Sequence, residues 1–125
     1  MVELPGFAAA IRDAGLSEGE ARRVFDRIAA APTAGDLIPG TGGARKVRFA
    51  GRGKGKRGGY RVITFYSGPE VPVFLITLFA KGEKVDLTQA ERNAIKRELA
   101  GLVEDYRPGA MRHVRRRRED PGQHS

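Results

Sequence analysis

The part of the sequence best suited to chemistry is a run of positive charges in the middle of the chain. Residues 44–61 contain eight Lys and Arg side chains and no acidic one: Arg45, Lys46, Arg48, Arg52, Lys54, Lys56, Arg57 and Arg61. Like charges repel by about 1 kcal/mol per exposed pair at about 4 Å in water, so folding alone gives no reason to collect them. A solvated surface is the alternative interpretation, but the length of the run favours a phosphate-binding role.

Glycines are interleaved with these charges. Residues 51–59 read GRGKGKRGG, and glycine lets backbone N–H groups approach a phosphate as well. Residues 53–58 also match G-x-G-x-x-G, but the dinucleotide-binding form of that motif needs a helix after its last glycine. A strand is predicted from Tyr60 instead. We therefore interpret the glycines as a flexible connection between two strands.

Other catalytic groups are sparse. The chain has no Cys, and its histidines, His113 and His124, both lie near the C-terminus. The carboxylates are scattered at spacings that suit helix surfaces, and Ser17 is better placed as a helix cap than as a nucleophile. The sequence therefore predicts no metal site and no cofactor, and it leaves Lys and Arg, with Tyr60 or Tyr66, as the available catalytic groups.

Lysine and arginine can carry out one reaction without further help, the cleavage of RNA. RNA supplies its own nucleophile in the 2′-OH, and the protein must supply a base, an acid and cations for the charge that develops on the phosphorus. Crowding by neighbouring cations favours the neutral amine that a lysine base requires. The run is therefore suited to cleaving RNA as well as to binding it.

The whole composition agrees with an anionic partner. The chain has 125 residues and a formal net charge of +8, with a mean hydropathy of −0.42. It contains no apolar run near the roughly 18 residues of a membrane span and no signal peptide at its start. We expect a cytoplasmic protein that does not enter a membrane.

Two helices are predicted first. Apolar residues at helical spacing follow Pro5, and Gly15 is placed to end that helix. Ser17 and Glu20 then form a capping box for a second helix, which Pro32 stops. Residues 2–4 are expected to form a short edge strand, and residues 32–43 read as a loop.

Strands follow, and a last helix closes the domain. From residue 45 the pattern has a period of two, with Val47 and Phe49 on one face and Lys46, Arg48 and Ala50 on the other. Further strands are predicted over 60–66 and 71–80. A capping box at Thr88 and Glu91 begins a helix that runs to about Arg107. We expect an α+β fold, with one domain over residues 1–107 and a basic, disordered tail over residues 108–125.

Two stretches of the chain resemble a known family. Residues 35–66, with the runs GTGGARK and GKGKRGG, and residues 74–96 resemble RelE-type toxins of type II toxin–antitoxin systems, in particular the HigB-like branch. The resemblance implies a RelE-like α+β fold, in which a helical hairpin packs on a small antiparallel sheet with a C-terminal helix. It also implies a ribosome-dependent, metal-independent mRNA endoribonuclease that inhibits translation. Its partners would be mRNA on the ribosome and a cognate antitoxin.

The resemblance also assigns residues. It makes Lys46, Arg48, Arg61 and Lys81 the catalytic candidates, and Lys54, Lys56, Arg57 and Lys84 RNA-binding candidates. Arg45 joins the RNA-binding candidates because it belongs to the charge run. Some RelE proteins place a catalytic tyrosine just before the last helix, where this chain has Leu87. Lys46 is our candidate for the base, and Arg61 or a lysine would have to act as the acid.

Two other functions remain open. ParE-like members of the superfamily share the architecture but poison DNA gyrase and have no nuclease site. A non-catalytic nucleic-acid-binding module would use the same cations to hold phosphates without cutting. The dense charge run and the HigB-like resemblance favour the nuclease over the ParE-like activity, and a translation extract would separate the nuclease from a binding module.

Overall fold

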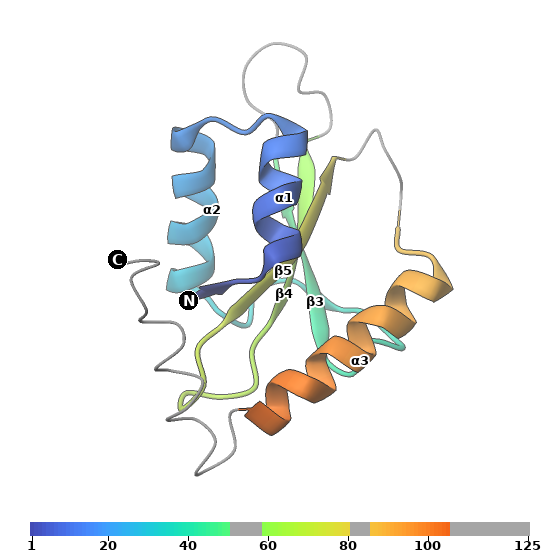
Figure 1. Cartoon of the computed structure of the whole chain (residues 1–125). Coiled ribbons are helices and arrows are strands. Elements are labelled where there is room, and N and C mark those ends of the chain that lie inside the picture. Colours follow the sequence, from blue (N-terminus) through green and yellow to red (C-terminus); the bar gives the residue numbers. More distant parts are fainter. Residues whose placement is uncertain (51–58, 81–85, 106–125) are drawn as a thin grey trace.

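The computed structural model describes residues 1–50, 59–80 and 86–105. In this part of the chain a five-stranded sheet in the order β1-β5-β4-β3-β2 lies between a helical hairpin and a third helix (Figure 1). The helices are α1 (Pro5–Ala14), α2 (Glu18–Ala30) and α3 (Gln89–Asp105), and the strands are β1 (Val2–Glu3), β2 (Asp36–Leu37), β3 (Ala44–Phe49), β4 (Tyr60–Phe65) and β5 (Phe74–Ala80). The predicted α+β class is confirmed.

The two helices of the hairpin begin and end where their capping residues lie. Helix α1 has Pro5 in its first turn and ends at Gly15, whose φ of 71° is readily adopted by a residue without Cβ. At the start of α2 the Ser17 hydroxyl accepts a hydrogen bond from the Glu20 N–H at 3.1 Å, and the Glu20 carboxylate accepts one from the Ser17 N–H at 2.9 Å. The predicted capping box is confirmed.

The sheet differs from the predicted one in two ways. It is mixed, because β1 pairs in parallel with β5 while β2–β3, β3–β4 and β4–β5 are antiparallel. Strands β1 and β5 are far apart in the sequence, so no tight turn forces them to run in opposite directions. In addition, Asp36 and Leu37 lie within the predicted loop 32–43, yet they pair with Lys46 and Arg45 as β2. A two-residue strand is too short to show a period of two.

The sheet is covered on both faces. One face packs Val47, Val62 and Leu75 against Phe7, Val24 and Ile28 of the α1–α2 hairpin. The other face packs Ile63, Phe65, Phe74 and Phe79 against Leu87, Ile95 and Leu99 at and within α3. Because both faces are buried, β4 is buried along its whole length, as expected for a strand between two apolar layers.

A tight turn joins β2 to β3 and contains the GTGG sequence. The fully buried Thr41 hydroxyl donates to the Ile38 carbonyl at 2.7 Å and accepts from the Ala44 N–H at 3.0 Å. Gly43 has a φ of 120°, and a Cβ there would lie 3.2 Å from the Phe65 ring. The side chain of Thr41 therefore holds the turn together and fixes where β3 begins.

Helix α3 has the predicted capping box. The Thr88 hydroxyl accepts from the Glu91 N–H at 3.1 Å, and the Glu91 carboxylate accepts from the Thr88 N–H at 2.8 Å. The helix is described to Asp105. Several predicted features lie outside the described residues. They are the end of this helix near Arg107, the domain boundary at 107–108, the tail 108–125 with both histidines, and most of the glycine-rich connection.

Candidate nucleic-acid interface

Three of the predicted catalytic cations share one face of the sheet. In β3, Val47 and Phe49 pack toward the α1–α2 hairpin, so the alternation of the strand places Lys46 and Arg48 on the face that α3 partly covers. The register pairs Arg48 with Arg61 of β4, and directly opposed residues point to the same face. The structure therefore brings Lys46, Arg48 and Arg61 together.

The opposition of Arg48 and Arg61 is unfavourable for the isolated fold. Like charges directly opposite each other on neighbouring strands destabilise a sheet. Arg61 is also only 7% exposed, and its Nε has no hydrogen-bond partner among the described residues. A buried, charged donor that lacks a partner is costly. An anion bound at this face would remove both penalties.

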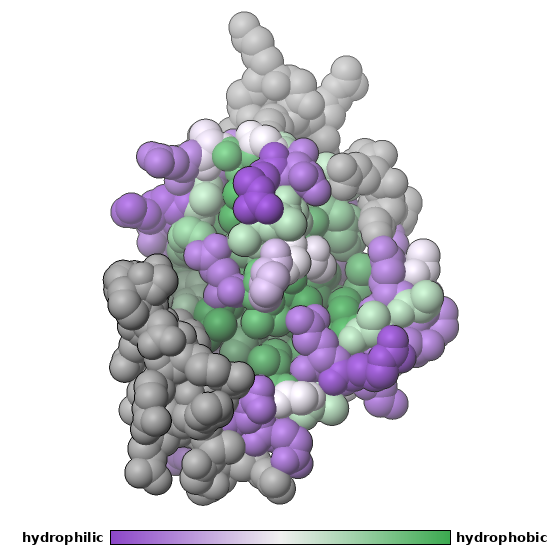
Figure 2. All heavy atoms as spheres, viewed as in Figure 1, coloured by the Kyte–Doolittle hydropathy of each residue, from purple (hydrophilic) through white to green (hydrophobic). Residues whose placement is uncertain are grey.

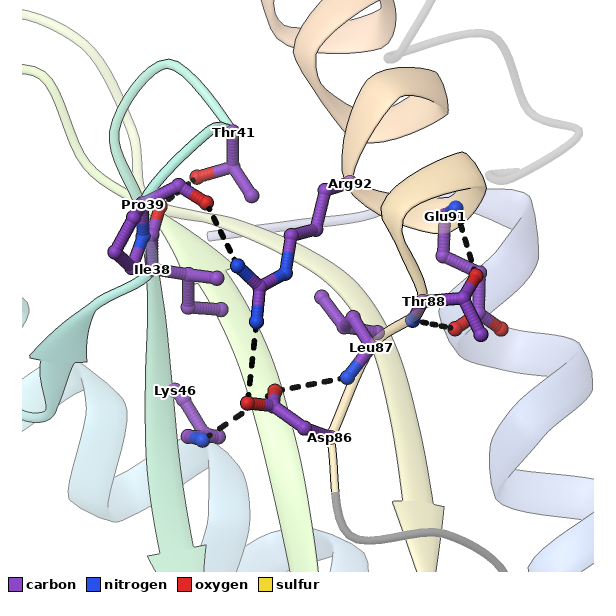
Figure 3. Close-up of polar contacts among 9 residues, drawn as sticks. All are labelled: Ile38, Pro39, Thr41, Lys46, Asp86, Leu87, Thr88, Glu91 and Arg92. Atoms are coloured by element: carbon purple, nitrogen blue, oxygen red, sulfur yellow. Dashed lines mark hydrogen bonds and ion pairs between the residues drawn. The ribbon is translucent and has the colours of Figure 1, made fainter.

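A carboxylate that we did not predict lies beside Lys46. Asp86 precedes α3, and its Oδ1 lies 3.5 Å from Lys46 Nζ while also accepting a hydrogen bond from the Leu87 N–H at 2.8 Å (Figure 3). That backbone hydrogen bond is the main cause that lowers the pKa of Asp86 below its ordinary value, and the charges of Lys46 and Arg92 lower it further against the opposing effect of desolvation. Asp86 is therefore ionised at neutral pH.

Arg92 ties this carboxylate to the GTGG turn. One guanidinium nitrogen, Nη2, lies 3.2 Å from Asp86 Oδ2, and the other, Nη1, donates to the Pro39 carbonyl at 3.4 Å (Figure 3). The first turn of α3 and the turn before β3 are thus linked through one side chain. Sequence reasoning missed Asp86 and Arg92, because only the tertiary fold brings the start of α3 next to β3.

The remaining described candidates lie elsewhere. Arg45 belongs to the opposite face of β3, and its guanidinium donates to the Gly35 carbonyl at 3.2 Å. Tyr60 is buried against the hairpin and Tyr66 packs on the same cluster, so neither tyrosine reaches the face that carries Lys46. Leu87, at the position where some RelE proteins have a tyrosine, is buried in the core beneath α3.

The other candidates lie outside the described residues. These are Lys54, Lys56 and Arg57 in the glycine-rich connection and Lys81 and Lys84 after β5. Their roles stay predictions. Within the described ranges, no helix is long and apolar enough to cross a membrane, and no group of three or more His, Cys, Asp or Glu side chains could hold a metal ion.

An apolar pocket borders the cationic face, since its lining residue Phe79 lies directly opposite Arg61 on β5. It has a volume of about 380 Å³ and is lined by residues of α1, β5 and α3, among them Ile76, Phe79 and Ile95. Figure 2 shows apolar residues gathered between α1 and α3 in this view. Glu98 of α3 lies at the pocket, and partial burial raises the pKa of its carboxyl above the ordinary value.

Comparison with known protein families decides the assignment of the chain. A family model described as the RelE toxin of the RelE/RelB toxin–antitoxin system matches residues 6–119, which is most of the sequence. The chain belongs to the RelE toxin family. Family membership makes the protein a toxin of a toxin–antitoxin system and implies an antitoxin as its partner. RelE-family toxins are generally endoribonucleases, and the cationic face lies within the matched residues.

Proposed function

We propose that this RelE-family toxin is a ribosome-dependent endoribonuclease that cuts mRNA without a metal ion and so inhibits translation. The observation that carries the proposal is the gathering of Lys46, Arg48 and Arg61 on one face of the sheet. The GTGG and GKGKRGG runs support its assignment to the HigB-like branch. We propose the cytoplasm as its site of action and mRNA on the ribosome as its substrate.

The chemistry follows from what RNA brings to the site. The 2′-oxygen of the RNA attacks the neighbouring phosphorus, and the bond to the 5′-oxygen of the next nucleotide breaks. Negative charge grows on the phosphoryl oxygens as the reaction proceeds, and preorganised cations stabilise it most effectively. Arg61 suits this role because the residue is only 7% exposed and its buried Nε has no hydrogen-bond partner among the described residues. The buried Nε of Arg61 is therefore already desolvated before the reaction begins.

The surroundings of Lys46 change the role that we propose for it. Lys46 Nζ donates to the Asp86 carboxylate at 3.5 Å and forms an ion pair with it. Lys46 is therefore better suited to stabilise charge on the phosphate than to take the proton from the 2′-OH. The base would then come from another of the predicted lysines, Lys54 or Lys81.

The antitoxin has two surfaces to cover. An acidic segment would neutralise the cationic face, and an amphipathic helix would fit the apolar pocket between α1 and α3. Either mode would block access of mRNA to the toxin, and we propose that the cognate antitoxin uses such segments.

A translation extract programmed with a defined transcript tests the proposed function. The wild-type toxin should cut the transcript on ribosomes. Cutting should continue in excess EDTA, provided that the ribosomes stay intact. One fragment should carry a 2′,3′-cyclic phosphate or 3′-phosphate and the other a 5′-hydroxyl. A transcript with a 2′-deoxy nucleotide at the cut site should not be cut. Cutting of that transcript at an undiminished rate, or a 5′-phosphate product, would show that water is the nucleophile and refute the mechanism.

Variants connect the reaction to the cationic face. Arg61→Ala, and the double change of Lys46 and Arg48 to Ala, should abolish growth inhibition and transcript cutting. Loss of one preorganised charge contact costs about 3–4 kcal/mol of transition-state stabilisation. Arg61→Met keeps most of the buried volume and separates loss of charge from loss of fold. Arg22→Ala, an exposed change on α2, is the matched control. Full toxicity of a folded Arg61→Met protein would remove Arg61 from the site, and gyrase-dependent DNA breaks would indicate the ParE-like activity instead.

A further inference from the structure

A polar pocket lies at the free edge of β3. Strand β2 pairs only with Arg45 and Lys46, so the outer edge of β3 beyond Lys46 has no neighbouring strand in the part of the chain that the structure describes. The pocket at this edge has a volume of about 450 Å³. Its lining residues are Arg27, Gly35, Asp36, Lys46, Val47 and Arg48. The size falls within the range of small-ligand pockets, and a nucleotide would fit.

Arg27 comes from α2, and its guanidinium lies over the ring of Phe49. Its guanidinium carbon lies 5.6 Å from the centre of the Phe49 ring. Phe49 in turn stacks on Tyr60, with ring centres 5.7 Å apart and an angle of 10° between the planes. A guanidinium on an aromatic face keeps its N–H donors, which lie in its own plane, available to a ligand. Arg27 forms no ion pair with any described residue, so its charge is available too.

The charges of the pocket favour an anion. Arg27, Lys46 and Arg48 supply three positive charges against the single carboxylate of Asp36. Lys46 and Arg48 also belong to the face that carries Arg61, so a chain of phosphates that left this face over the edge of β3 would meet Arg27 next. Asp36 could accept a hydrogen bond from a ribose hydroxyl or a base amino group, which are donors that an RNA strand provides beside its phosphates.

We propose that this pocket is a phosphate-binding subsite that holds the RNA strand next to the reacting face, with Arg27 as its added contact. The inference rests on the proposed function, because it extends the path of the same substrate. It assigns to α2 a role in substrate binding that none of the sequence motifs indicated.

Binding of single-stranded RNA at several salt concentrations tests the subsite. The probe is a short fluorescein-labelled RNA with 2′-O-methyl groups, which cannot be cut by attack of its own 2′-oxygen, and the readout is fluorescence anisotropy. Each phosphate contact contributes about 0.7 to the slope of log affinity against log salt for a single strand. Arg27→Ala should lower the slope by about this amount, so that raising the salt from about 50 to 200 mM weakens its binding about 2.6-fold less than for the wild type.

Arg22→Ala is the matched control. It removes the same charge from an exposed position on the same helix, and Arg22 does not line the pocket. Its slope should equal that of the wild type. Equal slopes for Arg27→Ala and Arg22→Ala, or no salt-dependent RNA binding by the wild type, would overturn the subsite. Failure of the proposed function has a different signature, since a protein that only binds RNA would show the Arg27 effect in this assay and leave transcripts intact in the translation extract.

Discussion

Replacing Asp86 by Ala should destabilise the protein by about 2 kcal/mol. The carboxylate accepts the Leu87 N–H hydrogen bond, and it pairs with Lys46 and Arg92. Loss of a capping-type hydrogen bond to backbone N–H costs about 1 kcal/mol. Because the Asp86 side chain is 40% exposed, solvent screens the two ion pairs, and each contributes only about 0.5 kcal/mol. The expected loss of about 2 kcal/mol is the sum of the hydrogen bond and the two ion pairs.

Thermal unfolding followed by circular dichroism measures the effect. For a domain of this size 1 kcal/mol corresponds to about 3–5 °C, so the Tm of Asp86→Ala should fall by about 6–10 °C. Asp26→Ala is the matched control, since Asp26 is exposed on α2 and such changes usually stay within about 0.5 kcal/mol. Equal Tm values for the two variants would show that the Asp86 contacts do not stabilise the fold.

The pH dependence checks the electrostatic part of this reasoning. The pKa of Asp86 in the folded protein lies below its ordinary value of 3.8. The contribution of Asp86 is therefore complete above that ordinary value, and it is lost as the pH falls through the lower folded-state pKa. The difference in stability between wild type and Asp86→Ala should be constant from about pH 7 to 5 and shrink below about pH 4. A difference that grows on acidification would contradict the assignment.

Three further predictions concern the stability of the fold around the site and the C-terminal segment. Ser17→Ala should remove the capping box of α2 and cost about 1 kcal/mol in a urea titration; an unchanged midpoint would mean that the box is dispensable. Gly35→Ala should cost more than about 1 kcal/mol, because Gly35 has a φ of 94° and its Cβ would lie 2.5 Å from the Lys46 carbonyl oxygen. Gly101→Ala, in a helix with open space around it, should instead stabilise, and equal effects of the two would refute the strain argument. Deletion of residues 109–125 should leave the Tm unchanged and weaken RNA binding by an amount that shrinks as salt rises; a Tm lower by many degrees would show that this segment packs on the domain.

Local patterns predicted most of the elements and part of the site. Both capping boxes depend on residues three positions apart, so the sequence shows them directly. The period of two in β3 placed Lys46 and Arg48 on one face. The same alternation puts Arg45 on the other face beside Val47, yet charge alone had grouped it with the RNA-binding candidates. Residue type indicated the class of ligand, and strand geometry decided which of the charged residues share a face.

Long-range contacts are the part that local patterns could not predict. Pairing of Arg48 with Arg61 depends on the register between β3 and β4. The contact between Asp86 and Lys46 joins residues forty positions apart. Arg27 lines the pocket beside Arg48 only because α2 packs across β3, and nothing in the spacing of α2 marks it. These contacts exist only once the sheet and the helices have packed together.

The opposed pair of Arg48 and Arg61 also bears on how this protein should be handled in solution. Repulsion between two neighbouring guanidinium groups is weakened by added ions, because the screening length shortens from about 10 Å at 0.1 M salt to about 3 Å at 1 M. The free toxin should therefore gain stability as ionic strength rises. A polyanion that binds only the folded form should stabilise it by mass action. Preparations of the toxin without its partner would then be more stable in concentrated salt or phosphate than in dilute buffer.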